Sequence, residues 1–196
     1  MSKPLDVLLI TPPSRVQVYQ ELSRDFAAIE PPVWSGLIAT FLRQHSCSVA
    51  ILDAEAEGLN HQQTADRIAA IAPRLAVFVI YGQQPSASTQ CMPAGRKVCE
   101  ILTALADIPT LVMGTHPSAL PKRTLLEEPY TYVCQGEGPA TILGLVIALR
   151  APQHSLREVP GLWHMEKGVP VGNAPAQLLT NLDREVPGQA WDLLDM

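Results

Sequence analysis

The amino-acid sequence predicts an α/β fold built on a doubly wound parallel sheet, and two observations support the prediction. Five short apolar runs alternate with segments whose apolar residues recur every three or four positions. Strands that are continuously apolar are typical of a parallel sheet with helices on both faces. The chain has 196 residues, 47% of them hydrophobic, which suffices for one such domain with an extension.

The first half of the chain is predicted to supply two strands and two helices. The apolar run Asp6–Thr11 is the first strand, and the two prolines that follow it end the run. The prolines at positions 31 and 32 open a helix, because apolar residues then follow one helical face at Trp34, Leu37, Ile38 and Phe41. Residues 48–53 form the second strand. A capping-box spacing at Asn60 and Gln63 then starts a helix that buries Ala65, Ile68, Ala69 and Ala72.

The middle of the chain continues the alternation. The third strand is predicted at Leu75–Tyr81, and a polar loop at residues 82–88 follows it. A helix then follows, with Val98, Ile101, Leu102 and Leu105 on one face and Pro93 in or near its first turn. The fourth strand is Thr110–Met113, and a short helix around residues 118–127 separates it from the fifth strand, residues 130–134.

The fifth helix completes the repeat, with Gly138 as its N-cap and Pro139 at its first helical position. Five strand–helix repeats predict a flavodoxin-like, Rossmann-type sheet of five parallel strands in the order 2-1-3-4-5. After Arg150 the pattern changes. We therefore expect a ligand-binding domain at residues 1–150 and a hairpin with a linker at residues 151–196. In the hairpin, residues 161–166 pair with residues 169–173.

Charge and cysteine content argue against several classes of function. Charged residues make up only 17% of the chain, the net charge is −5, and no basic block occurs, which argues against nucleic acid or an anionic membrane as partner. No apolar run approaches the roughly 20 residues of a membrane span, and no signal-peptide pattern is present, so we expect a cytoplasmic protein. The four cysteines lack the spacing of a local zinc or iron–sulfur motif and are expected to be buried free thiols.

The loops after the five strands are the candidate ligand site, because the carboxyl ends of parallel strands share one edge of the sheet. These loops are rich in Gly, Pro, Ser and Gln, which suits a large, polar, nearly neutral ligand held by backbone groups. Neither a P-loop nor a dinucleotide-binding glycine motif occurs. The predicted ligand-binding residues are Thr11, Pro12, Pro13, Ser14, Asp53, Gly82, Gln83, Gln84, Pro85, Ser86, Ser88, Gly114, Thr115, His116, Pro117, Gln135, Gly136, Glu137 and Gly138.

Taken together, these segments resemble the N-terminal cobalamin-binding domain of the cobalamin-dependent radical SAM enzymes (class B methyltransferase-like). The matching segments occur in family order over nearly the whole chain, at residues 7–14, 31–60, 112–121, 132–141, 159–173 and 181–195. The His-Pro-Ser-Ala loop, the Gly-Glu-Gly loop and the Leu-Asp…Pro…Ala-Trp-Asp tail are specific in combination. Members usually show two glycines before the histidine loop. Met113 stands where the first would fall, so we expect a local difference in how the backbone meets the ligand.

The resemblance implies a function. In the family, cobalamin takes a methyl group from S-adenosylmethionine and gives it to a substrate radical, although some relatives catalyse cyclisation or rearrangement instead. Full-length members continue into a radical SAM barrel that supplies the cysteines for a [4Fe–4S] cluster, and this chain has no such cysteine motif. The chain is therefore expected to be the cobalamin module of a larger enzyme, with the barrel in cis or on a partner chain, or else a stand-alone relative. No catalytic residue is assigned to it.

His116 has three interpretations: lower ligand of the cobalt, general base, or wall of the pocket. No histidine lies in a D-x-H-x-x-G motif, and no carboxylate is near His116 in sequence, so the wall is favoured and no metal ligand is assigned. Cobalamin is then expected base-off, without a histidine on cobalt. Plain structural roles stay open for other predicted residues: a surface loop for residues 82–88, a helix cap for Asp53, and a helix-dipole partner for Glu137.

Three functions remain as alternatives at this point. The first is the cobalamin module of a radical SAM methyltransferase. The second is a cobalamin carrier or sensor without catalysis, and the third is a flavodoxin-like domain for another ligand, such as a nucleotide. The sequence does not identify the substrate of the parent enzyme.

Overall fold

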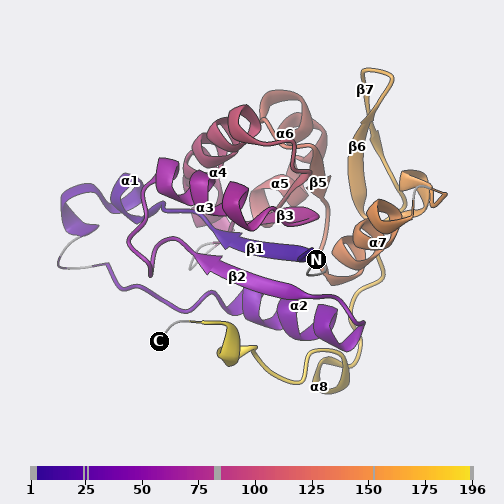
Figure 1. Ribbon diagram of the computed structural model, residues 1–196, viewed down its shortest axis with the longest axis horizontal. Coiled ribbons are helices and arrows are strands. Elements are labelled where there is room, and N and C mark those ends of the chain that lie inside the picture. The colour runs from indigo at the N-terminus through magenta and orange to yellow at the C-terminus, as the bar shows by residue number, and fades with distance from the viewer. Residues whose placement is uncertain (1–3, 24, 26, 82–84, 152, 195–196) are drawn as a thin grey trace.

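The sheet of this protein has the predicted strand order and two additional strands (Figure 1). The structure is a computed structural model that describes residues 4–23, 25, 27–81, 85–151 and 153–194. Across these residues the strands follow the order β2-β1-β3-β4-β5-β6-β7. The parallel strands are β1 (Val7–Thr11), β2 (Val49–Asp53), β3 (Leu75–Val79), β4 (Thr110–Met113) and β5 (Tyr132–Cys134). The predicted order 2-1-3-4-5 is thus confirmed.

The predicted hairpin is present and extends the same sheet. It consists of β6 (Leu162–Glu166) and β7 (Val169–Gly172), and β6 pairs antiparallel with β5. Lys167 and Gly168 join the two strands with φ angles of 51° and 80°, the left-handed conformation that a type I′ turn requires at both central residues.

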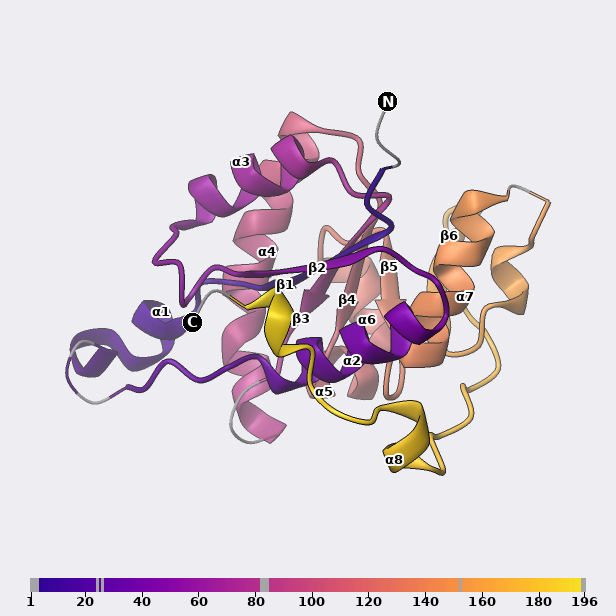
Figure 2. The same cartoon turned by 60° about the horizontal axis from the view of Figure 1, so that its bottom comes forward.

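Helices cover both faces of the sheet, as Figure 2 shows. One face packs against α2 (Val33–Gln44) and α7 (Pro139–Arg150), and the other against α3 (His61–Ile71), α4 (Pro85–Leu105) and α6 (Pro121–Glu127). Two apolar cores result, one on each side of the strands, and residues such as Leu9 and Phe78 in them are fully buried. All four cysteines are buried, as predicted, and none of them forms a disulfide bond.

Short elements complete the chain. The excursion between β1 and α2 contains α1 (Arg15–Tyr19) and η1 (Gln20–Ser23), and α5 (Thr115–Ala119) follows β4. After α7 come η2 (Leu156–Glu158), α8 (Leu182–Glu185) and η3 (Trp191–Leu193). The capping box of α3 forms as predicted, since the Asn60 side chain accepts a hydrogen bond from the Gln63 amide and the Gln63 side chain accepts one from the Asn60 amide, both at 2.9 Å.

Three local predictions are wrong. Pro93 lies well inside α4 instead of in its first turn, because the helix already begins at Pro85. The face of α3 ends earlier than predicted: Ala69 is only partly buried, and Ala72 is an exposed C-cap with φ 48°. The segment that follows β4 is already helical at Thr115, so two short helices, α5 and α6, replace the single predicted one.

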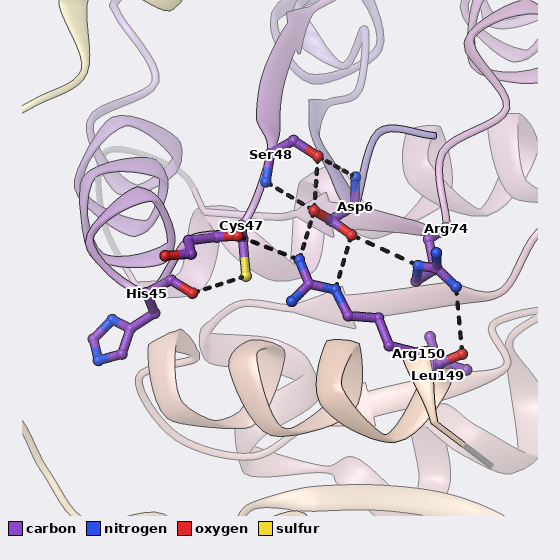
Figure 3. Close-up of polar contacts among 8 residues, drawn as sticks. Asp6, His45, Cys47, Ser48, Arg74, Leu149 and Arg150 are labelled. Carbon is purple, nitrogen blue, oxygen red and sulfur yellow. Dashed lines mark hydrogen bonds and ion pairs between the residues drawn. The ribbon is translucent and has the colours of Figure 1, made fainter. Parts of the chain in front are cut away.

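An ion-pair cluster fixes the amino edge of the sheet (Figure 3). Asp6 is fully buried, and its carboxylate lies 2.6 Å from the Arg150 guanidinium and 3.6 Å from that of Arg74. It also accepts hydrogen bonds from the Ser48 amide and hydroxyl at 2.9 and 2.7 Å. Burial alone would raise the pKa of Asp6, but the hydrogen bonds from Arg150 and Ser48 outweigh it and hold this pKa well below its usual value.

The C-terminal tail lies along α2 (Figure 2). The Ala190 amide donates to the Gly36 carbonyl at 3.2 Å, and Asp192 pairs with Arg43 at 2.8 Å. A side chain at Gly36 would collide with the tail, because a Cβ there would lie 2.1 Å from Gln189 Cγ. The tail therefore has a partner within the domain, the outer face of α2.

Candidate ligand-binding site

A cavity of about 280 Å³ lies at the carboxyl edge of the sheet, where the strand order reverses between β1 and β3. The ends of β1, β2 and β3 form its floor, and the excursion around α1 and the first turn of α2 form its walls. In doubly wound sheets the crevice at this switch point is the usual ligand site. The predicted residues Thr11, Ser14 and Asp53 lie in its lining.

The floor of the cavity carries hydroxyl groups without hydrogen-bond partners among the described residues. The Thr11 Oγ1 and Ser35 Oγ atoms are both buried and unpaired in this part of the chain, and both residues line the cavity. Ser35 is fully buried in the first turn of α2. A buried hydroxyl without a partner costs free energy, so two of them at one cavity indicate that a ligand completes their bonding.

Asp53 lies beside Thr11, because the two residues are partners in the parallel register of β1 and β2. Its side chain accepts a hydrogen bond from the Ala56 amide at 3.3 Å within a turn. The helix-cap role left open for Asp53 is wrong, because the next helix, α3, begins at His61 with Asn60 as its N-cap. Burial raises the pKa of this carboxyl, and the neighbouring Glu55 and Glu57 raise it further against that hydrogen bond. The Asp53 carboxyl lines the cavity, where it can form hydrogen bonds with a ligand.

An aromatic pair forms the rim of the cavity. The rings of Trp34 and Tyr81 are stacked, with their centroids 4.8 Å apart and an interplanar angle of 22°. Trp34 keeps 46% of its surface exposed, so it offers an apolar face to a ligand. Burial raises the pKa of Tyr81 to about 12, and its phenol is therefore neutral at physiological pH.

The excursion after β1 is held by Arg15. Its guanidinium donates to the carbonyls of Ser23 and Ala27 at 3.1 and 3.4 Å, and its backbone amide donates to the Glu55 carboxylate. The Arg15 Nε atom also lies 3.7 Å from that carboxylate. These contacts tie the loop after β1 to the loop after β2 on one side of the cavity.

The loop after β4 depends on Gly114. This residue has φ 150°, and a Cβ on it would lie 2.0 Å from the Ile80 carbonyl oxygen, so only glycine fits. The Ser88 hydroxyl donates to the same carbonyl at 2.6 Å and accepts a hydrogen bond from the His116 amide at 3.1 Å. This arrangement joins the start of α4 to the loop.

His116 is partly buried in that loop, and its Nδ1 atom lies 3.0 Å from the Thr89 hydroxyl of α4. Burial lowers the pKa of His116 and the nearby Arg123 lowers it further, so the ring is neutral at pH 7. His116 is absent from the lining of the cavity at the switch point. Its predicted role in the wall of the ligand pocket therefore stays a prediction.

The side chains of the loop after β5 contact other parts of the protein. Gln135 accepts a hydrogen bond from the Trp163 indole at 2.8 Å, and Glu137 accepts one from the Leu179 amide at 2.9 Å. Gly138 is the N-cap of α7, as predicted, and its missing Cβ leaves room for the Met113 side chain. Gly136, in contrast, has open space where a Cβ would be, so a ligand can approach its backbone.

The structure thus brings the predicted residues to one edge but not all to one cavity. Thr11, Ser14 and Asp53 line the cavity. Residues 114–117 and 135–138 lie outside its lining, in the loops that follow β4 and β5 at the same edge of the sheet. Gly82, Gln83 and Gln84 lie outside the described residues, as do the side chains of Pro85 and Ser86. Their predicted role stays a prediction.

Sequence reasoning missed most of the residues that line the cavity, and three of them bear on ligand binding: Trp34, Ser35 and Tyr81. The sequence pattern places Trp34 on the apolar face of a helix and Tyr81 at the end of a strand, and neither position by itself indicates a ligand. The signal for Ser35 was its position, because a serine three and seven residues before Ile38 and Leu42 lies on the buried face of a helix. A polar side chain on such a face needs a partner.

Two further findings concern metal binding and membrane insertion. No three His, Cys, Asp or Glu side chains in the described ranges gather in a way that could hold a metal ion. Among the helices that the structure describes, none has the length and apolar character needed to cross a membrane.

Comparison with known proteins gives one family and a set of similar structures. A family model described as B12 binding domain matches residues 22–146. No curated protein matches the chain. The radical S-adenosylmethionine methyltransferase TsrM from Kitasatospora setae, solved with cobalamin and a [4Fe–4S] cluster bound, is 19% identical with a TM-score of 0.66, and the match covers 91% of this chain and 30% of that one.

A second solved structure is similar over more of the chain. The cobalamin-dependent S-adenosylmethionine radical enzyme OxsB, with aqua-cobalamin and S-adenosylmethionine bound, is 18% identical with a TM-score of 0.72. The match covers 97% of this chain and 25% of that one, so this chain spans less than a third of the length of either enzyme. At these identities the likeness shows a shared fold.

Proposed function

The chain belongs to the B12 binding domain family, and from this premise we propose that it holds cobalamin base-off for methyl transfer in a radical SAM enzyme. As a B12-binding domain it is similar in fold to the domains of cobalamin-dependent radical SAM enzymes. The observation that carries the proposal is the cavity at the switch point, with its unpaired Thr11 and Ser35 hydroxyls. The base-off mode of cobalamin binding and the methyl-transfer step are both part of this proposal.

The residues at the edge fit cobalamin. The corrin ring carries neutral amide side chains around its rim, and the cavity floor offers hydroxyl, carboxylate and backbone groups for hydrogen bonds. Gly136 leaves its backbone open to a large ligand, and Trp34 offers an apolar face. A cavity of about 280 Å³ is at the lower end for small-molecule sites, so it would enclose part of the cofactor and leave one side of the ring open.

The lining of the cavity supports binding without a protein ligand on cobalt. Its described lining residues include no histidine. The single sulfur ligand in reach is Cys91, and burial raises the pKa of this thiol, so it stays protonated and binds metal poorly. His116, at the next loop, contacts Thr89.

When bound, cobalamin supplies a cobalt centre that carries a methyl group from S-adenosylmethionine to the substrate. The role of this chain would be to bind and orient the cofactor. Thr11 and Asp53, at the floor of the cavity, would support the corrin ring, and the rigid turn at Gly114 would fix the loop after β4 beside it. The stacked Trp34 and Tyr81 rings exclude water from one side. A radical SAM domain, in the same chain or on a partner, is the proposed source of the radical and of the [4Fe–4S] cluster.

Titration with hydroxocobalamin tests the proposal. Saturable binding with a base-off change in the visible spectrum is the expected result. Reduction of the complex to cob(II)alamin should then give an electron paramagnetic resonance spectrum without nitrogen coupling from an axial ligand, and His116→Ala should leave that spectrum unchanged.

Other results would point to other functions. Nitrogen coupling that disappears in His116→Ala would overturn the ligand-free mode. Absence of any spectral change on titration would overturn cobalamin binding and favour a domain for another ligand. Binding without methylation, in the presence of an active radical SAM partner and S-adenosylmethionine, would favour a carrier or sensor.

A further inference from the structure

We infer that Thr11, Ser35 and Asp53 form a subsite for one primary carboxamide of the corrin rim. The inference rests on the proposed function, since it takes cobalamin as the ligand of the cavity. It goes further by assigning one chemical group of the ligand to named atoms of this chain.

The donor side of the subsite is the first turn of α2. The amides of a helix's first turn have no partners within the helix, and the N-cap residue here, Pro32, makes no side-chain hydrogen bond. The Val33 amide donates to the Pro31 carbonyl at 2.8 Å, so the first-turn amides left for a ligand are those of Trp34 and Ser35. No acidic residue occurs in this turn to balance the positive end of the helix. The fully buried Ser35 hydroxyl, unpaired among the described residues, lies in the same turn and lines the cavity. Together these groups favour an oxygen acceptor.

The acceptor side is supplied by β1 and β2. Asp53 is 8% exposed, and the Ala56 amide bonds one of its carboxylate oxygens, Oδ1. Thr11, its register partner, adds a hydroxyl oxygen that is buried and without a partner in the described ranges. A primary carboxamide matches both sides at once, because its carbonyl accepts from the helix end and its NH₂ group donates to Asp53 or Thr11.

The charges around the cavity select an amide over an anion. Glu30, Asp53 and Glu55 line it, while the Arg15 side chain is committed to Glu55 and to two backbone carbonyls. A carboxylate or phosphate in the same place would meet like charges. A neutral amide meets none of this repulsion and can use the same hydrogen bonds.

A ligand subsite has a signature that a structural hydroxyl lacks. Removing a buried, unpaired hydroxyl relieves a desolvation cost in the free protein, so Ser35→Ala and Thr11→Val should keep or raise its melting temperature. The same changes remove a hydrogen bond to the ligand. Stability and affinity should therefore move in opposite directions.

The experiment measures hydroxocobalamin dissociation constants and melting temperatures for the whole chain. Ser35→Ala and Thr11→Val should each weaken binding about five- to tenfold, the effect of one hydrogen bond. Thr103→Val is the matched control, because its hydroxyl bonds the Cys99 carbonyl on the outer part of α4, remote from the cavity. It should bind as the wild type does.

Amide-hydrolysed cobalamins give the second arm. The wild-type chain should bind at least one monocarboxylic acid derivative of cobalamin more than tenfold more weakly than cobalamin, because its carboxylate meets Asp53. Asp53→Asn keeps the side-chain oxygen and removes the charge, so it should reduce that discrimination.

The outcomes separate the two proposals. If the wild-type chain binds hydroxocobalamin and both hydroxyl variants bind equally well, the subsite is wrong and the proposed function stands. A melting temperature that falls in Ser35→Ala would also overturn the subsite, because the hydroxyl would then be bonded within the protein. If the wild-type chain binds no cobalamin, the proposed function fails and the subsite with it.

Discussion

Single residues set the shape of the carboxyl edge, and Gly114 is the clearest example. Its Cβ would lie 2.0 Å from a backbone oxygen of Ile80, which cannot move without displacing β3. Gly136 has a similar left-handed backbone, with φ 107°, but open space around it. Gly114 is buried and Gly136 is exposed, so the pair compares a positive-φ glycine that has a close backbone contact with one that has none.

Gly114→Ala is predicted to destabilise the protein by more than Gly136→Ala. We expect a loss of about 3 kcal/mol in the free energy of unfolding for Gly114→Ala, from backbone strain and overpacking together, and about 1 kcal/mol for Gly136→Ala from strain alone. Urea denaturation of both variants measures the difference. Equal losses would mean that the Ile80 contact has no energetic consequence.

At the scale of elements, the Asp6 cluster joins three strands to a helix. Asp6 precedes β1, Ser48 precedes β2, Arg74 precedes β3 and Arg150 ends α7. The cluster lies at the amino edge of the sheet, opposite the proposed cofactor site. It should therefore affect stability and leave ligand binding unchanged.

The Asp6 carboxylate is predicted to make stability depend on acid pH. Its pKa is lowered in the folded protein, so its contribution is complete above the unfolded pKa of about 4 and is lost as the pH falls below that value. Asp6→Asn should cost about 2–3 kcal/mol at pH 7, because the arginines are left without their buried partner.

Unfolding free energies between pH 2 and 7 provide the measurement. The difference between the wild type and Asp6→Asn should shrink as the pH falls through the acid range. Asp192→Asn, which removes an exposed partner of Arg43, is the control and should change stability little. A constant difference at every pH would contradict the assigned role.

Gly36→Ala is predicted to release the tail from α2 without weakening the helix. Alanine favours a helix over glycine by about 1 kcal/mol, but its Cβ would displace Gln189 and with it residues 178–194. Trypsin should cut the variant after Arg184 several-fold faster than the wild type. Gly144→Ala in α7 has the same gain in helix propensity without a tail contact, so it should be cut at the wild-type rate.

The sequence predicted the order of the elements well, because each strand and helix has its own apolar period. Where it failed, the local composition was misleading or the deciding contacts were distant in the chain. The start of α4 at Pro85 was hidden by the polar composition of residues 82–88. The pairing of β6 with β5 follows from a register that no local pattern encodes.

The candidate site was predictable in place but not in detail. The switch point follows from strand order, and Thr11, Ser14 and Asp53 follow from strand ends. Trp34 and Ser35 belong to α2, which begins at Val33, far along the chain from the end of β1 at Thr11. Only the packing of α2 over β1 brings them to the cavity.

At the scale of the whole molecule, few residues are charged (17%), and exposed apolar side chains gather near the cavity. Val16, Leu22, Ile29 and Val33 belong to the excursion or the start of α2 and are each about half exposed or more. This distribution agrees with the proposal that a further domain covers the open side of the cofactor.

Cobalamin is predicted to stabilise the whole domain. A ligand that binds only the folded state at 100 times its dissociation constant adds about 2.7 kcal/mol, which corresponds to a rise of about 5–10 °C in melting temperature for a chain of this size. Thermal unfolding with hydroxocobalamin measures it. Asp6→Asn should melt lower but show the same rise, and an unchanged wild-type melting temperature would contradict the prediction.

The two edge strands of the sheet, β2 and β7, affect the tendency of the protein to aggregate at high concentration. An exposed edge strand has unpaired backbone N–H and C=O groups, to which a strand of another copy of the chain can pair. Here β7 is only four residues long, contains Pro170 and ends at Gly172, so it is a poor template for further pairing. At the opposite border Leu193 and Leu194 share a pocket with Ile51 of β2. The hairpin and the tail thus act against fibril growth at high concentration, independently of any cofactor.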